Sequence, residues 1–203
     1  MEKLKSALIL IGFQNDYFGE DGSLREVVQE SLEATGVLKN TLNMIEELTN
    51  MLIISTPIVF TSDYCELIEP VGILKIIKDV GAFKMGETGS EIIPEIKILG
   101  DVVMHIPGKQ GLNAFINTNL EKILEANKIT EVLLAGVVCS ICIDSTGRSA
   151  FEQGYKVTML SDCISGRTVF EQKFYCDNIF PLYSKVIDSK EFIREFKSRI
   201  FDV

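Results

Sequence analysis

Short apolar runs recur along the chain, separated by longer stretches whose apolar residues follow helical spacing. Continuous apolar runs of four to eight residues are typical of strands buried on both faces of a parallel sheet. The runs lie at residues 7–11, 53–61, 102–104, 132–137, 157–160 and 185–187. They predict six strands.

Helical periodicity fills the intervals between these runs. In residues 27–51, for example, Val37, Leu38, Leu42 and Ile45 follow helical spacing. Further helices are predicted at 112–127, 141–153, 168–178 and 190–200. Strands that alternate with helices predict an α/β fold, a Rossmann-like three-layer α-β-α sandwich around a mostly parallel six-stranded sheet. No repeat or linker interrupts the pattern, so we expect one domain over residues 1–203.

Composition narrows the possible partners. The chain has 203 residues, and 20 Lys and Arg against 29 Asp and Glu give a net charge of -9. Scattered acidic charge disfavours nucleic acid and anionic membranes as partners. No apolar stretch reaches the ~20 residues that span a bilayer, and residues 1–6 lack the pattern of a secretory signal. We therefore expect a cytoplasmic protein that acts on a small molecule.

The cysteines indicate free thiols. There are five, at 65, 139, 142, 163 and 176, an odd number in a chain without an export signal. With His105 as the single histidine, a zinc site would have to be built mainly from cysteines, and only Cys139 and Cys142 are closely spaced. We expect neither a metal nor another cofactor.

The residues after each predicted strand carry the candidate chemistry, because ligands of such sheets bind beyond the carboxyl ends of the strands. Cys142 opens the predicted helix 141–153, where the helix dipole and free backbone N–H groups favour a thiolate. Lys109 follows the third strand and would favour that thiolate further. The pair predicts a sulfur nucleophile, with the same N–H groups available to an oxyanion.

Several segments, in order and at compatible spacing, resemble one family over nearly the whole chain. Residues 7–18 are similar to the Leu-Ile-Asp-Met-Gln-Asn-Asp-Phe signature of isochorismatase-like cysteine hydrolases, a group that includes nicotinamidases and N-carbamoylsarcosine amidases. Lys109 lies four residues before Asn113-Ala114-Phe115, as in the family's Lys-x-x-x-Ser-Ala-Phe. Residues 135–142 resemble its Ala-Gly-Val-x-Thr-x-x-Cys, with Cys139 in the threonine position. Residues 89–95 and 154–158 also match.

The resemblance implies a catalytic aspartate, lysine and cysteine, and a thioester intermediate on the cysteine. The lysine corresponds to Lys109 and the cysteine to Cys142, but the aspartate corresponds to Gly12. Gly12, Phe13, Val138 and Cys139 are candidates for binding the substrate or its oxyanion. Amide cleavage without the aspartate loses a general acid, which is typically worth ~10²–10⁴ in rate.

Two other carboxylates are positioned to stand in for the missing aspartate. Asp16 follows the first strand, although Asp in such a loop is often a turn or cap residue. Asp63 follows the second strand, where nicotinamidase-like members place a metal-binding aspartate. The matching metal histidines are absent, since Tyr64, Cys65 and Glu66 follow instead.

Three functions therefore stay open. The first is a hydrolase that cleaves an amide, carbamoyl or related carbonyl bond of a small metabolite through Cys142. The second, motivated by Gly12, is a protein that binds or senses a small molecule without chemistry. The third is a redox sensor in which Cys139 and Cys142 form a reversible disulfide. The resemblance also implies a homo-oligomer, a dimer or tetramer.

Overall fold

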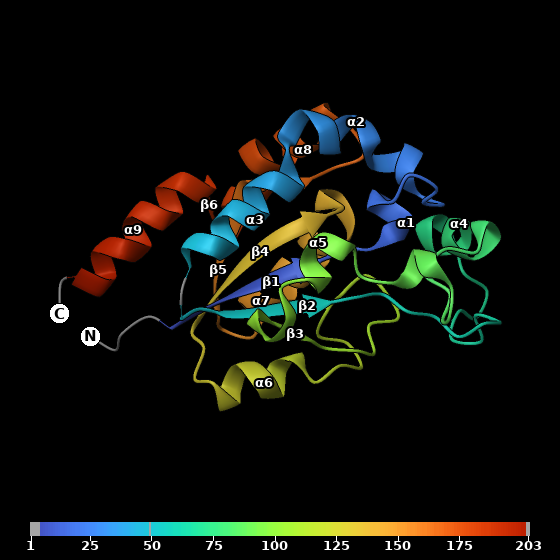
Figure 1. The fold of residues 1–203 in the computed structure, drawn as a ribbon, viewed down its shortest axis with the longest axis horizontal. Coiled ribbons are helices and arrows are strands. Elements are labelled where there is room, and N and C mark those ends of the chain that lie inside the picture. The colour runs from blue at the N-terminus through green and yellow to red at the C-terminus, as the bar shows by residue number, and fades with distance from the viewer. Residues whose placement is uncertain (1–4, 49, 202–203) are drawn as a thin grey trace.

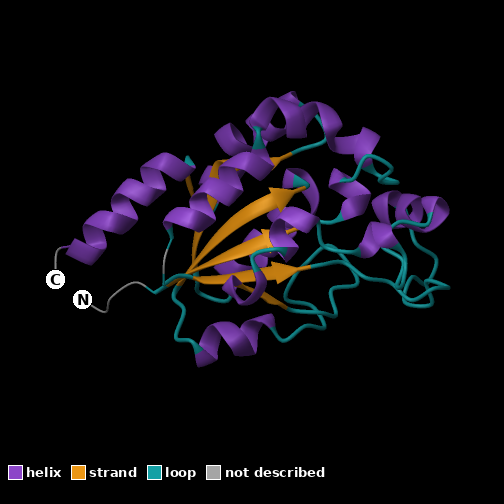
Figure 2. Cartoon of the chain, in the orientation of Figure 1, coloured by secondary structure: helices purple, strands orange, loops and turns teal. Residues whose placement is uncertain are grey.

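The computed structural model describes residues 5–48 and 50–201, which form a twisted sheet covered by helices (Figures 1 and 2). The remaining positions lie outside the described residues. They include most of the N-terminal segment expected to lack a signal and position 49 of the predicted helix 27–51. The strands are β1 (Ser6–Ile11), β2 (Leu52–Thr56), β3 (Val103–His105), β4 (Glu131–Val137), β5 (Lys156–Ser165) and β6 (Lys185–Ile187).

All pairings between these strands are parallel, in the order β3-β2-β1-β4-β5-β6. The predicted α/β class and the six strands are confirmed. β1 is central, since Ile11 pairs with Thr56 of β2 on one side and with Gly136 of β4 on the other. The strand order reverses between β1 and β4, so the carboxyl ends of these two strands form the switch point at which such sheets bind ligands.

Helices of four residues or more cover both faces of the sheet. In chain order they are α1 (Asn15–Phe18), α2 (Arg25–Thr35), α3 (Val37–Glu47), α4 (Gly72–Val80), α5 (Pro94–Lys97), α6 (Leu120–Ala126), α7 (Asp144–Glu152), α8 (Val169–Phe174) and α9 (Ser189–Phe201). Two π-helical turns, η3 (Cys139–Ile143) and η4 (Tyr175–Ile179), precede α7 and follow α8. Single 3₁₀ turns are η1 (Thr88–Ser90), η2 (Gly100–Val102) and η5 (Phe180–Leu182).

The sheet separates two apolar cores. Successive residues of a strand point to opposite faces, so Ile9 and Ile11 enter one core while Leu8 and Leu10 enter the other. The first core also contains apolar residues of α4, α6 and α7, and the second contains those of α3, α5 and α9. Figure 1 shows α3 and α9 along one side of the sheet and α6 on the other. This arrangement is the predicted three-layer sandwich.

Several predicted boundaries are wrong for identifiable reasons. The predicted helix 27–51 is two helices, because Gly36 adopts a left-handed φ of 63° and its N–H closes α2 on the Leu32 carbonyl. The predicted strand 53–61 ends at Thr56, since Pro57 has no N–H for a sheet hydrogen bond. The predicted helix 112–127 begins only at Leu120, whose N–H is accepted by the Thr118 hydroxyl.

Within the described ranges, no helix combines the length and apolar character needed to cross a membrane.

Candidate active site

Cys142 lies at the switch point of the sheet. The chain leaves the carboxyl end of β4 through a cis peptide between Val137 and Val138 and enters η3. The Val138 carbonyl accepts hydrogen bonds from the N–H groups of Ile141 and Ile143, at 3.0 and 3.2 Å. These bonds close the turn and place the Cys142 side chain in the core that also contains Ile11, where 2% of the residue stays exposed.

Lys109 reaches Cys142 from the loop that follows β3. Its backbone is fixed by a bridge to Ile58 and by the Val59 N–H, which donates to the Lys109 carbonyl at 3.1 Å. The side chain is fully buried. Its Nζ donates to the Gly111 carbonyl at 2.8 Å and lies 3.5 Å from Cys142 Sγ. The structure therefore brings together the two residues that the sequence singles out as lysine and nucleophile.

The electrostatics of the pair depend on both members. Burial lowers the pKa of Lys109 because it disfavours the ammonium, whereas negative charge on Cys142 and its hydrogen bond raise that pKa again. A cation beside the sulfur is an arrangement that suits an activated nucleophile.

The surroundings of this pair are narrow. A cavity of about 200 Å³ lies on the outer side of the Lys109 loop. It is lined by Gln110, Gly111, Leu112, Asn113, Ile116, Asn117 and Ser145. Gly111 accepts the Lys109 hydrogen bond, and Ser145 follows Cys142 by three positions, so the cavity is lined by neighbours of the pair and not by the pair itself. Cys142 is 2% exposed, so side chains around it have to move before a substrate carbonyl meets the sulfur.

The carboxylates of Asp16 and Asp63 are engaged away from the pair. Buried Asp16 accepts the N–H groups of Ser23 at 3.2 Å and of Phe83 at 2.5 Å. Asp63 is exposed and accepts hydrogen bonds within its own loop, which lower its pKa: the Thr61 hydroxyl at 2.9 Å is the largest cause, followed by the Cys65 N–H. Among the described residues, Lys109 Nζ and Cys142 Sγ have no carboxylate within hydrogen-bond distance.

Gly12 occupies a position that favours glycine. Its φ is +74°, and a Cβ there would lie 2.8 Å from both the Val137 carbonyl oxygen and Cγ2. The next residue, Phe13, points its side chain into the core on the opposite face of the sheet from Cys142, where it stacks on Phe18. The structure therefore does not bring the Phe13 side chain to the pair.

Tyr17 is a neighbour of the pair that sequence reasoning missed. Its ring lies against Gly12, with Cδ2 3.4 Å from the position of a Cβ on that glycine. Burial raises the pKa of Tyr17 well above 10.0, and negative charge on Cys142 and then on Asp16 raises it further. The signal in the sequence was its place in the loop after β1, beside Gly12 and Asp16.

Val138 and Cys139 are both buried beside Cys142. Cys139 faces a different environment, however. Its Sγ lies 3.0 Å from where a Cβ on Gly166 would stand, and the Glu171 carboxylate lies equally close to that point. Burial, and then the charge of Glu171, raise the pKa of Cys139 strongly. Cys139 thus sits in surroundings that suit a neutral thiol.

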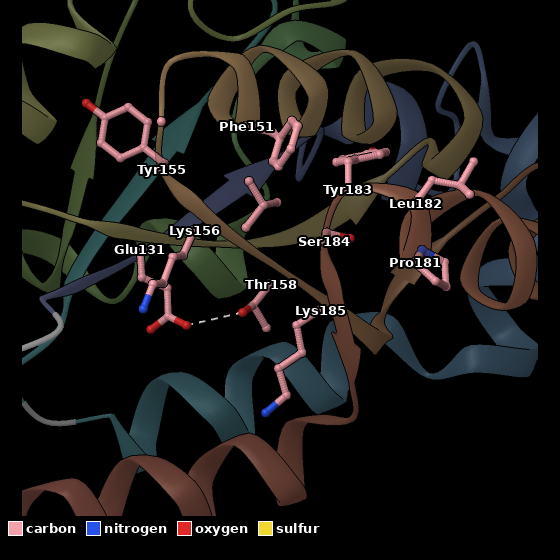
Figure 3. Close-up of a pocket in the computed structure, with 12 residues that line it drawn as sticks. Glu131, Phe151, Tyr155, Lys156, Thr158, Pro181, Leu182, Tyr183, Ser184 and Lys185 are labelled. Carbon is pink, nitrogen blue, oxygen red and sulfur yellow. Dashed lines mark hydrogen bonds between the residues drawn. The ribbon is translucent and has the colours of Figure 1, made fainter.

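Elsewhere in the described part of the chain, neither a metal-binding cluster nor the largest cavity offers a competing centre. Residues 5–48 and 50–201 contain no group of three or more His, Cys, Asp or Glu side chains arranged to hold a metal ion. A larger cavity, about 680 Å³, is lined by Glu131, Lys156 and neighbouring residues (Figure 3). Glu131 and Lys156 begin β4 and β5, so this cavity lies at the amino ends of the strands, at the opposite end of β4 from Cys142. Its buried carboxylate, Glu131, already accepts hydrogen bonds from Ser6 and Thr158.

Comparisons with known sequences agree with one another. A family profile described as the isochorismatase domain matches residues 6–191. An uncharacterized isochorismatase family protein of Bacillus subtilis is 30% identical over 118 residues, which are 58% of this chain and 61% of that relative. The chain thus spans less than two thirds of that relative. A ureidoacrylate amidohydrolase of Variovorax paradoxus is 26% identical over 209 residues, covering 94% of this chain and 81% of the relative.

A solved structure shows the same fold. The cysteine hydrolase from Pseudomonas syringae pv. phaseolicola matches with a TM-score of 0.80 at 18% sequence identity, over 98% of this chain and 95% of that chain.

Proposed function

The chain belongs to the isochorismatase family, and on this premise we propose that it is a cysteine hydrolase that cleaves a C–N bond of an amide or carbamoyl group in a small molecule. One observation carries the proposal. Cys142 Sγ and the buried Lys109 Nζ lie 3.5 Å apart at the switch point of the sheet. A buried ammonium beside a thiol is the arrangement that generates a sulfur nucleophile at neutral pH.

The chemistry follows from this pair. The Cys142 thiolate attacks the carbonyl carbon, and the negative charge moves to the carbonyl oxygen. Loss of the amine leaves a thioester on Cys142, which water hydrolyses to the acid and the free thiolate. Lys109 stabilises the thiolate at the start and end of each cycle, when no substrate carries the charge.

Two observations support this substrate class: the burial of Cys142 and the description of one relative. The near-complete burial of Cys142 favours a small acyl or carbamoyl group. The Variovorax paradoxus relative is described as an amidohydrolase of ureidoacrylate, a compound with a terminal carbamoyl group. We therefore place N-carbamoyl compounds and small primary amides first among the substrates to test.

The test is a screen of the purified protein for ammonia release from N-carbamoyl amino acids and primary amides, together with acyl transfer from p-nitrophenyl acetate. Cys142→Ala should lower turnover of every substrate by on the order of 10⁴-fold or more, as expected when a covalent nucleophile is removed. The matched control is Cys176→Ser, a buried free cysteine of η4, which should retain turnover within about threefold, since it changes a single packed atom outside η3.

Two results would contradict the proposal. One is turnover that survives in Cys142→Ala, and the other is an absence of any Cys142-dependent reaction across the screen. A small molecule that stabilises wild type and Cys142→Ala equally, and is recovered unchanged, would identify a binding protein instead. A reversible disulfide between Cys139 and Cys142 under mild oxidant would favour the sensor.

A further inference from the structure

The Lys109–Cys142 pair lacks a group that amide cleavage requires. A thiolate expels an amine only if the departing nitrogen receives a proton, because an amide anion is a very poor leaving group. The Asp16 and Asp63 carboxylates are held elsewhere by Phe83 and Thr61. Lys109 already donates to Gly111 and Cys142. The leaving nitrogen therefore needs another proton donor near Cys142.

Tyr17 is placed where a donor is needed. Tyr17 follows Gly12 by five positions. Its ring atom Cδ2 lies 3.4 Å from the point that a Cβ on residue 12 would occupy, so the ring borders the space that a side chain there would enter. The Tyr17 ring and Cys142 belong to the same core. The charge of Cys142 acts directly on the Tyr17 hydroxyl.

The Tyr17 hydroxyl is free to meet a substrate. It forms no hydrogen bond with any described residue. Among all the described residues, Thr41 Oγ1 is the one side-chain oxygen or nitrogen that is fully enclosed without a hydrogen-bond partner. Tyr17 is 2% exposed, and its hydroxyl is not among the enclosed atoms without a partner. Its proton is therefore not committed to another described group of the protein.

The ring is held rigidly for this purpose. The Asp16 carboxylate fixes the Phe83 N–H at 2.5 Å, and the Phe83 ring packs on Tyr17 with 5.1 Å between centroids. On the other side, the Gln14 carbonyl accepts the Tyr17 N–H at 3.0 Å. The Gln14 amide is itself anchored to Ile58 and Ser90. In this arrangement Asp16 is a positioning residue for Tyr17.

We propose that the Tyr17 hydroxyl donates the proton that the leaving nitrogen receives, an inference that rests on the proposed hydrolase function and extends it. Thiolate attack forms the S–C bond and moves the electron pair of the C=O bond onto oxygen. As that pair returns, the C–N bond breaks, nitrogen takes the Tyr17 proton, and a thioester and a phenolate remain. Water then gives its proton to the phenolate while its oxygen attacks the thioester, and the Cys142 thiolate leaves.

The charges of the site favour this order of events. Burial keeps Tyr17 protonated in the resting protein, and the thiolate charge raises its pKa further. When Cys142 is acylated, that charge is gone, and one cause that raises the pKa of Tyr17 is removed. The proton is thus held before attack and released after it.

The test compares two probes that share an acetyl group and differ in the leaving group. Departure of p-nitrophenolate from p-nitrophenyl acetate needs no proton, whereas departure of the amine from p-nitroacetanilide does. Tyr17→Phe should lower kcat/KM for the anilide by about 10²–10⁴-fold and leave the burst of Cys142 acylation by the ester within about threefold. The matched control is Tyr64→Phe, a buried tyrosine whose hydroxyl donates to the Ala82 carbonyl, which should affect both probes equally.

Each outcome decides the matter. Equal losses for ester and anilide in Tyr17→Phe indicate a packing role and overturn the inference, as does an unchanged anilide rate. A wild type that is acylated by the ester but cleaves neither the anilide nor any carbamoyl compound also overturns it, while the nucleophile stands. Absence of Cys142-dependent ester acylation in wild type overturns the proposed function itself. Should Tyr17→Phe fail to fold, 3-fluorotyrosine at position 17 should move the alkaline limb of the anilide pH profile to lower pH and leave the ester burst unchanged; an unmoved limb contradicts the proposal.

Discussion

Cys139 and Cys142 begin and nearly end the same five-residue turn, and both are buried, yet their electrostatic surroundings are opposite. Cys142 Sγ lies 3.5 Å from the Lys109 ammonium. Cys139 Sγ faces Gly166 and the Glu171 carboxylate instead, and burial followed by that negative charge raises its pKa. Position at the start of a helix is therefore shared, while the charged neighbour is not.

Burial alone does not select a nucleophile. Both thiols lose solvation, which by itself favours the neutral form. Only Cys142 has a buried cation beside it. Burial lowers the pKa of that cation, Lys109, so a nearby negative charge stabilises the ammonium. The two groups of that pair compensate one another, whereas Glu171 already has a partner in Arg167, at 2.6 Å.

Removing the cation should produce the largest change. Lys109→Met keeps the length and apolar stem of the side chain but leaves Cys142 without its ammonium. We expect kcat/KM to fall by about 10²–10³-fold, the usual loss when a group that stabilises charge at the reacting atoms is removed. Alkylation of Cys142 by iodoacetamide, followed by peptide mass spectrometry, should also become slower, because the cation beside the sulfur is gone.

The control for this variant is Lys75→Met, an exposed lysine paired with Asp79 within α4, which should leave both measurements unchanged. If Lys109→Met were alkylated at Cys142 at the wild-type rate, the contrast between the two cysteines would have another origin.

The sequence predicts those features of the site that depend on local pattern. β1 and β4 are buried along their whole length, so their apolar runs were visible, and their ends located Cys142. The predicted encounter of Lys109 with Cys142 is present in the structure. Contacts between segments far apart in the chain could not be predicted from the sequence pattern. The hydrogen bond from the Phe83 N–H to Asp16 spans 67 positions, and nothing local distinguishes Asp16 as an anchor from Asp16 as a catalyst.

Aromatic residues illustrate the same limit at shorter range. Phe13 and Tyr17 are both aromatic and lie four positions apart, so the sequence pattern does not distinguish them. In the structure they lie in cores on opposite faces of the sheet. The turn at Gly12, with its positive φ, and the short helix α1 decide which ring lies in the core that contains Cys142. A four-residue helix has too few positions to show a period.

The stability of the Lys109 variant should depend on pH, a smaller effect than the loss of activity. Because the pKa of Lys109 is lowered in the folded protein, the cost of burying its charge is fully present below the folded pKa. Between that pKa and 10.5 the unfolded chain binds the proton and the folded chain does not, so stability rises with pH. In a Cys142→Ala background, which removes the thiol titration, adding Lys109→Met should stabilise the fold at neutral pH. This gain should shrink towards pH 10.5.

Urea denaturation of the two proteins, from about pH 7 upward, measures this difference, and all other titrating groups are common to both. A free-energy gap that stays constant over the whole range would show that the Lys109 ammonium is not paying the desolvation cost inferred from its burial.

The smallest expected effect comes from the Cys139 side of the comparison. Glu171→Gln removes the negative charge near Cys139 but keeps an oxygen that accepts from the Arg167 N–H, now at 2.6 Å. Cys139 should then be alkylated a few-fold faster at alkaline pH, and no more, because burial remains the main cause of its raised pKa. Loss of the ion pair with Arg167, which is half exposed, should cost about 1 kcal/mol or less of unfolding free energy.

Turnover at Cys142 in Glu171→Gln should stay within about twofold, because Lys109 is untouched. A larger loss of turnover would mean that the charges on the two sides of η3 are coupled, and that the two thiols cannot be treated as separate sites.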